Sequence, residues 1–349
     1  MKNIGKFWMM PRNNKFHELM TNTGQWPETL KIIDVLGFAD SILDLFSEDE
    51  LKQCFAAMRE HNIPLALEIG AIKEWSYTEN NGRGTAYGQK MVDHLTVRLK
   101  KFQELGANLK AVAFDEPLCN LLNAGFPPSV WDWIWQEQGI SADDIKAQRD
   151  AKFDFAVEHT TYLIRALRET FPGLQIGDIG TFPFADDFAY PWLKAMKDEI
   201  DFFRLDVDWN YFTDHKRADL FPEEVDGWKE VKLVEDNCRE IGIPFSLIYW
   251  SPEEGKYLGS DGYYDDDRDK DAADKVWYDQ IMHQFEQYEA VGGKPDQYVI
   301  ETWTRVKSKD DSGNDITLPM PPTAIPEKPE AGKYTFTQSV LDFYNKIKW

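Results

Sequence analysis

Carboxylates recur at the ends of short apolar runs in this 349-residue chain. One run ends in Asp115 and is followed at once by Glu116 and Pro117. Burial and a neighbouring negative charge both raise the pKa of a carboxyl group. Carboxyl groups held close together can therefore differ in pKa and act as an acid and a base. The candidates for such proton-transfer chemistry are Glu68, Asp115, Glu116, Asp178, Asp206, Asp208 and Glu301.

The runs that carry these carboxylates have the length of β-strands and alternate with longer amphipathic stretches of helix length. Ser47, followed by acidic residues, is typical of a helix start, and Gly106 and Gly242 are typical of helix ends. A last helix is predicted at 337–347. The eight strand-like runs lie at 4–10, 32–38, 63–70, 109–115, 174–180, 201–208, 243–250 and 297–303.

Eight β-then-α units predict an α/β fold, a single (β/α)₈ TIM barrel over residues 1–349, because parallel neighbouring strands need a crossover helix. An open doubly wound sheet is the competing fold. It usually carries a glycine-rich phosphate turn after its first strand, which residues 9–13 lack. The long loops at 71–88, 117–140, 251–271 and 304–334 all follow strand ends, on the face where barrels build their sites.

The alternation of side chains along a strand predicts which carboxylates face the barrel axis. In most runs the large apolar residues suit the helix side and leave acidic or small residues on the axis side. In the fifth run the assignment is less decided, because glycines fall on both faces. The carboxylates expected to meet at the barrel mouth beside Glu116 are Glu68, Asp115, Asp206, Asp208, Glu301 and, less clearly, Asp178.

The charge of the chain excludes some partners. A net charge of −22 repels phosphate backbones and anionic lipid headgroups, so we expect neither nucleic acid nor membrane as partner. Three cysteines without a CxxC pair encode neither a disulfide framework nor a zinc ribbon, and the six histidines show no ligand spacing. The acidic run 265–271 resembles the start of a calcium loop but lacks the required Gly and the closing Glu. We therefore expect no metal and no cofactor.

Aromatic residues supply a second signal. The chain has thirteen tryptophans, and several fall on the loop side of the predicted strands. An indole has a flat apolar face and one donor, which suits stacking on a sugar ring. Trp131, Trp133 and Trp135 are assigned to the core instead. The residues predicted to bind substrate are Trp75, Arg83, Asp178, Trp209, Trp250 and Trp303.

The sequence Asp115-Glu116-Pro117 resembles the Asn-Glu-Pro of the large clan of retaining barrel glycosidases, in which the Glu is the general acid/base. Glu301, followed by Thr302 and Trp303, resembles their late-strand nucleophile, although it stands on the eighth predicted strand and that clan uses the seventh. Short motifs between residues 60 and 305 also resemble a little-characterised bacterial group of glycosidase-like barrels.

Together these features predict a glycoside hydrolase that cleaves an oligo- or polysaccharide, with Glu116 as general acid. The second carboxylate is expected to be Asp206, with Asp208, Glu301 and Glu68 as alternatives, while Asp115 and Asp178 orient or tune the pair. A magnesium- or manganese-dependent lyase or isomerase is the alternative enzyme, because Glu68, Glu116 and Asp178 would suit a hard cation. A sugar-binding barrel without catalysis is the alternative outside enzymes.

The remaining expectations concern location and assembly. Residues 1–14 show neither a signal peptide nor a membrane span, and the sequence leaves the compartment open. We expect a carbohydrate as the partner and a monomer or small homo-oligomer as the state of assembly.

Overall fold

The structure is a computed structural model. It describes residues 5–70, 85–118, 141–181, 189–207, 226–250, 263–265, 270–302, 305–309, 315–319, 325–328, 330 and 333–349. No helix within these ranges combines the length and the apolar character that crossing a bilayer requires.

Eight strands form a closed barrel in the order β1-β2-β3-β4-β5-β6-β7-β9. Every pair of barrel strands whose register is given is parallel, which confirms the predicted (β/α)₈ barrel. Each strand falls within one of the eight predicted runs, except that β2 extends one residue beyond its run. The strands are β1 (Phe7–Met10), β2 (Val35–Ala39), β3 (Leu65–Ile69), β4 (Leu109–Asp115), β5 (Gln175–Gly180), β6 (Phe202–Leu205), β7 (Phe245–Tyr249) and β9 (Gln297–Glu301).

The predicted signals mark the start of α4 (Glu48–Glu60) and the ends of α5 (Thr85–Glu104) and α11 (Gly227–Ile241), and the predicted last helix lies one residue earlier than expected. Ser47 forms a capping box with Glu50, and Gly242, at φ 81°, adopts the left-handed conformation that ends a helix. The other α-helices are α1 (Phe16–Thr21), α2 (Pro27–Ile32), α3 (Ile42–Leu45), α8 (Ala142–Thr170), α9 (Tyr190–Met196), α12 (Lys270–Ala290) and α13 (Phe336–Lys346).

The chain divides into two compact units. One contains Ala66–Glu104 and Leu109–Leu247, and the other contains Gly5–Leu65, Leu105–Asn108 and Ile248–Trp349. The assignment of residues 1–349 to one domain therefore stays a prediction.

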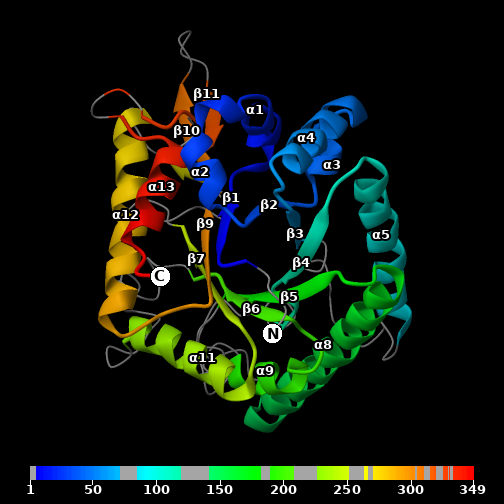
Figure 1. Ribbon diagram of the computed structural model, residues 1–349. Helices are drawn as coiled ribbons and strands as arrows, with labels where there is room; N and C mark the ends of the chain where they lie inside the picture. The colour runs from blue at the N-terminus through cyan, green and yellow to red at the C-terminus, as the bar shows by residue number, and fades with distance from the viewer. Residues whose placement is uncertain are drawn as a thin grey trace. The chain divides into compact units, whose positions relative to one another are not determined.

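In the first unit α5 and α8 lie side by side (Figure 1). Gly88 of α5 stands at their crossing, where its backbone N–H donates to Nδ1 of the buried His159 over 3.1 Å. A Cβ at this position would lie 2.9 Å from the Tyr162 ring. The close approach of the two helices therefore requires a residue without a side chain here.

In the second unit a carboxylate from the C-terminal part of the chain holds the start of α2. Glu327 accepts a hydrogen bond from the backbone N–H of Glu28 over 3.0 Å and a second from that of Thr29. The Thr29 hydroxyl donates in turn to the carbonyl of Thr337 over 2.9 Å. These bonds join α2 to the start of α13 and satisfy N–H groups that a helix leaves open at its first turn.

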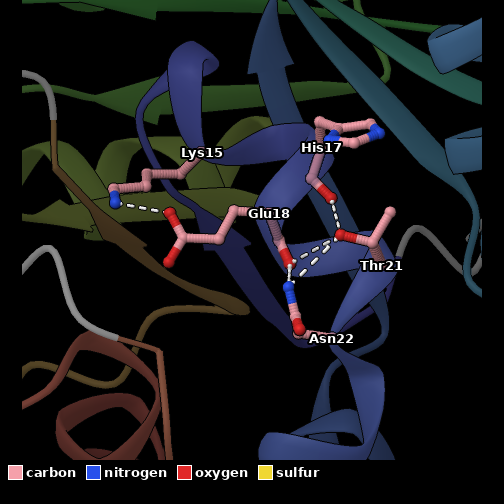
Figure 2. A network of polar contacts seen from close by, with 5 residues as sticks. All are labelled: Lys15, His17, Glu18, Thr21 and Asn22. Carbon is pink, nitrogen blue, oxygen red and sulfur yellow. Dashed lines mark hydrogen bonds and ion pairs between the residues drawn. The ribbon is translucent and has the colours of Figure 1, made fainter.

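Side chains also close the end of α1 (Figure 2). The Thr21 hydroxyl donates to the carbonyl of His17 over 2.7 Å, and the Asn22 amide donates to that of Glu18 over 2.8 Å. Lys15 pairs with the Glu18 carboxylate over 2.5 Å. Among the last four carbonyls of this six-residue helix, which have no acceptor role within it, that of Glu18 thereby gains a side-chain donor.

A second, three-stranded sheet was not predicted. Its strands, in the order β11-β10-β8, are β8 (Tyr263–Asp265), β10 (Arg305–Lys309) and β11 (Asp315–Pro319). They arise from the long segments after the seventh and eighth predicted runs, which the sequence suggested were loops.

Candidate active site

The register of β4, β5 and β6 decides which side chains share a face. Asp115 pairs with Ile179, and Ile179 pairs with Arg204. Asp178 pairs with Phe114 on one side and Phe203 on the other. Since paired residues of parallel strands point to the same face, Asp115 and Arg204 share one face and Asp178 lies on the opposite one.

The face of Asp115 is the axis side of the barrel. Arg204, 1% exposed, donates from Nε to the Ser246 hydroxyl over 3.3 Å and lies 5.5 Å from the centre of the Phe202 ring. Gly177 gives this ring its space, because a Cβ there would lie 2.2 Å from it. Asp115, 5% exposed, stands above this layer at the end of β4.

Asp178 points toward the helix layer. The Trp192 indole of α9 donates to Asp178 Oδ2 over 2.5 Å, and the Asp178 side chain is 1% exposed. Its Oδ1 has no hydrogen-bond partner among the described residues. The expectation that Asp178 faces the axis is therefore wrong: Gly177 occupies the axis side of this strand against Phe202, which turns Asp178 outward.

Burial raises the pKa of Asp178 to about 8, and the negative charges of Asp115 and Glu116 add to the effect. The hydrogen bonds from Trp192 and from the backbone of Ile179 oppose it by stabilising the ionised form. Asp178 is thus mostly protonated at neutral pH, beside two other carboxyl groups. The structure brings Asp115, Glu116 and Asp178 within electrostatic reach of one another at the ends of β4 and β5.

Glu116 is the first residue after β4. Its backbone N–H donates to the Ile179 carbonyl over 2.9 Å, which extends the pairing of β4 with β5 by one residue. It adopts a left-handed conformation with φ 55°, which is uncommon for a residue with a side chain. Pro117 follows directly. Such backbone strain concentrates at functional sites, and here it falls on the residue predicted to be the acid.

Two other candidates belong to the same unit as Glu116. Asp206 follows β6, is partly buried, and its backbone N–H donates to the Gly180 carbonyl over 2.8 Å. Glu68 is partly buried and precedes the last residue of β3. Which of the two would act with Glu116 stays a prediction.

The second unit contains two further candidates. Glu301, 8% exposed, ends β9 opposite Met10 of β1. Trp250 follows β7 and is 4% exposed, while its carbonyl accepts a hydrogen bond from the Gln284 amide over 2.8 Å. The Trp250 ring is thus packed rather than open for a sugar to stack on.

Several predicted residues lie outside the part of the chain that the structure describes. They are Trp75, Arg83, Asp208, Trp209 and Trp303, as well as Trp131, Trp133 and Trp135. The side chains of the acidic run 265–271 lie outside it as well. Within the described ranges no group of three or more His, Cys, Asp or Glu side chains is arranged to hold a metal ion.

Sequence reasoning missed Trp192. The predicted sugar-stacking tryptophans follow the ends of strands. Trp192 instead stands on a helix, and its indole contacts Asp178 of β5. Its signal was its place on a helix between two acid-bearing strands, but the pairing with Asp178 depends on how that helix packs.

No protein-family model matches the chain, and no curated protein matches it. Among solved structures the chain is similar to the AHE enzyme from Alicyclobacillus herbarius, at 10% identity and TM-score 0.49, covering 96% of this chain and 87% of that one.

Two further solved structures show a similarly distant resemblance. The Ignisphaera aggregans GH53 catalytic domain is 10% identical at TM-score 0.47, covering 86% of this chain and 81% of that one. The D-psicose 3-epimerase from Clostridium cellulolyticum H10 is 12% identical at TM-score 0.43, covering 85% and 84%. At these identities and TM-scores the similarities indicate neither a substrate nor a mechanism for this chain.

Proposed function

We propose that this chain is a glycoside hydrolase in which Glu116 is the general acid. The observation that carries the proposal is the cluster of Asp115, Glu116 and Asp178 at the ends of β4 and β5, where burial keeps one carboxyl protonated at neutral pH. Neighbouring carboxyl groups held in different protonation states are what acid–base catalysis requires.

Cleavage of a glycosidic bond needs a carboxylic acid at the leaving oxygen and a second carboxylate as nucleophile or base. In the proposal Glu116 gives its proton to the leaving oxygen, and Asp206, or else Glu68, is the second carboxylate. Asp115 orients the pair from the axis side. The configuration of the product would be retained at a carboxyl separation of about 5 Å and inverted at roughly 6.5 to 9.5 Å.

The substrate is proposed to be a neutral oligo- or polysaccharide, because the charge of −22 disfavours polyanionic glycans. A second candidate function rests on the same cluster. A protonated acid beside ionisable carboxyls could also move a proton between two carbon atoms of a free sugar, which is the chemistry of an isomerase.

One experiment separates these functions. The protein is incubated with an array of neutral oligosaccharides and with free sugars in D₂O, with and without EDTA. We expect the oligosaccharides to yield new reducing ends at the same rate with and without EDTA. Incorporation of deuterium at a carbon atom of uncleaved sugar would contradict the hydrolase assignment and indicate an isomerase. Activity lost with EDTA and restored by Mn²⁺ would indicate a metal enzyme, and sugar binding without either reaction a binding protein.

A matched pair of variants ties the activity to this site. Glu116→Gln keeps the shape of the side chain and removes its acid, so turnover should fall by about 10²- to 10⁴-fold. Glu104→Gln changes an exposed glutamate of α5 and should leave turnover unchanged. Wild-type turnover in Glu116→Gln would remove Glu116 from the acid role.

A further inference from the structure

The two carboxyl oxygens of Asp178 differ in their hydrogen bonding. Oδ2 accepts from the Trp192 indole over 2.5 Å, whereas Oδ1 has no hydrogen-bond partner among the described residues, although the side chain is 1% exposed. A buried polar atom without a partner is costly, and such atoms in native proteins call for an explanation. Because Trp192 occupies Oδ2 as a donor, the proton of a neutral Asp178 resides on Oδ1.

The elements packed around Asp178 differ in whether they carry a hydrogen-bond acceptor for the proton on Oδ1. Phe203 of β6 and Trp192 of α9 do not titrate in this range. Asp115 and Glu116 of β4 act on Asp178 through their negative charge. Among the described residues, the two carboxyl groups that act on Asp178 and could accept a hydrogen bond from Oδ1 through one bridging water thus come from the end of β4.

We infer that Asp178 is a positioning residue whose Oδ1 donates a hydrogen bond to the carboxylate that Glu116 becomes when it releases its proton. The inference rests on the proposed function. The O–H bond of Glu116 breaks, its proton joins the leaving glycosidic oxygen, and the electron pair stays on Glu116. Asp178 keeps its own proton throughout.

Such a donor accelerates the reaction because it binds the transition state better than the resting enzyme. A hydrogen bond to an ionised oxygen is stronger than one to a neutral carboxyl group. The bond from Asp178 therefore strengthens as negative charge develops on Glu116, and a fixed donor costs no reorganisation at that moment. With a pKa of about 8 the donor is present at neutral pH and is lost in alkaline solution.

Two variants of Asp178 test the inference by activity. In Asp178→Asn the amide oxygen can accept from Trp192 and the NH₂ can donate in place of Oδ1, so kcat should stay near the wild-type value. Asp178→Leu fills the same space without a donor, and kcat should fall by about 10²-fold with KM unchanged. Glu116 titrates in both proteins and Asp178 only in wild type, so the ratio of the wild-type kcat to the Asp178→Asn kcat should fall as the pH rises through about 8.

Equal kcat values for the Asn and Leu variants, or the same alkaline decline in Asp178→Asn as in wild type, would overturn the inference. Should Asp178→Leu not fold, Trp192→Phe takes its place. This variant keeps an aromatic ring against Phe153 and removes the donor that fixes Oδ2. The fall of its kcat relative to that of Asp178→Asn should move to higher pH, because the lost bond favoured the ionised Asp178.

A second measurement needs no substrate. The infrared C=O stretch of the protonated Asp178, identified as the band missing from Asp178→Asn, is followed through a pH titration. Its midpoint should fall in Glu116→Gln, because one neighbouring negative charge is gone. It should not move in Glu104→Gln, whose exposed carboxylate is not among the groups that raise it.

This second measurement separates the failure of the inference from the failure of the proposed function. An unchanged midpoint in Glu116→Gln overturns the inference even if glycosides are cleaved. A lowered midpoint in a protein that cleaves no glycoside supports the coupling of Asp178 to Glu116 and removes the hydrolase assignment.

Discussion

Two buried carboxylates of this protein meet opposite environments. In the second unit Glu327, 9% exposed, accepts backbone N–H groups of Glu28 and Thr29 with its two oxygens at the start of α2. In the first unit Asp178, 1% exposed, accepts the Trp192 indole N–H, is also stabilised in its ionised form by the backbone of Ile179, and has two carboxyl groups within electrostatic reach.

The difference separates a carboxylate that holds a helix start from one to which we assign a role in the proposed reaction. The charge of Glu327 meets the positive end of a helix and open backbone donors, so the site is complete as it stands. Asp178 lies where its charge is disfavoured and where Oδ1 has no hydrogen-bond partner among the described residues. This costs folding free energy and, in the inferred role, keeps Asp178 protonated as a hydrogen-bond donor.

The largest effect expected is on the pH dependence of stability. The folded state raises the pKa of Asp178 from 3.8 to about 8, so the folded protein binds this proton more tightly than the unfolded chain. The stabilisation of the folded state by this proton is complete below about pH 4 and is lost as the pH rises to about 8. Urea unfolding should show wild type losing stability relative to Asp178→Asn by up to about 1.4 kcal/mol per pH unit in this window. Parallel curves would contradict the assignment.

A smaller effect is expected at Glu327. Glu327→Ala leaves two N–H groups of α2 without their acceptor and should lower the free energy of unfolding by about 1–3 kcal/mol. The matched control is Glu330→Ala, which shortens an exposed side chain of the same segment and should leave the melting temperature unchanged. Equal melting temperatures of the two variants would remove Glu327 from its structural role.

The smallest effect is expected at Trp192. Trp192→Phe removes one buried hydrogen bond and should cost about 1 kcal/mol of unfolding free energy. The infrared midpoint of Asp178 should move upward. Trp228→Phe, in a buried tryptophan of α11, serves as control and should leave that midpoint where it is. A downward shift in Trp192→Phe would mean that the indole does not stabilise the ionised form.

Local patterns were sufficient to predict the barrel. Strand length, helix periodicity, the Ser47 cap and the Gly242 end are properties of a few consecutive residues, and each is found where expected. The sheet of β8, β10 and β11 was missed because its short strands lie within long segments rich in polar and acidic residues.

The candidate site was predictable in its residue types but not in its geometry. Carboxylates at strand ends are visible in sequence, and Asp115, Glu116 and Asp178 do come together. The face taken by Asp178 depends on the fit of Phe202 against Gly177, and its partner Trp192 on how α9 packs. Both are tertiary facts that no alternation within one strand contains.

The central claim, that Glu116 is a general acid, is tested most directly by the leaving group. Glu116→Gln is assayed on a glycoside with a sugar alkoxide as leaving group, which needs protonation, and on a dinitrophenyl glycoside, which does not. If Glu116 is the general acid, kcat falls by about 10²- to 10⁴-fold on the first substrate and far less on the second. An equal loss on both substrates, or no loss on either, would contradict the acid role of Glu116.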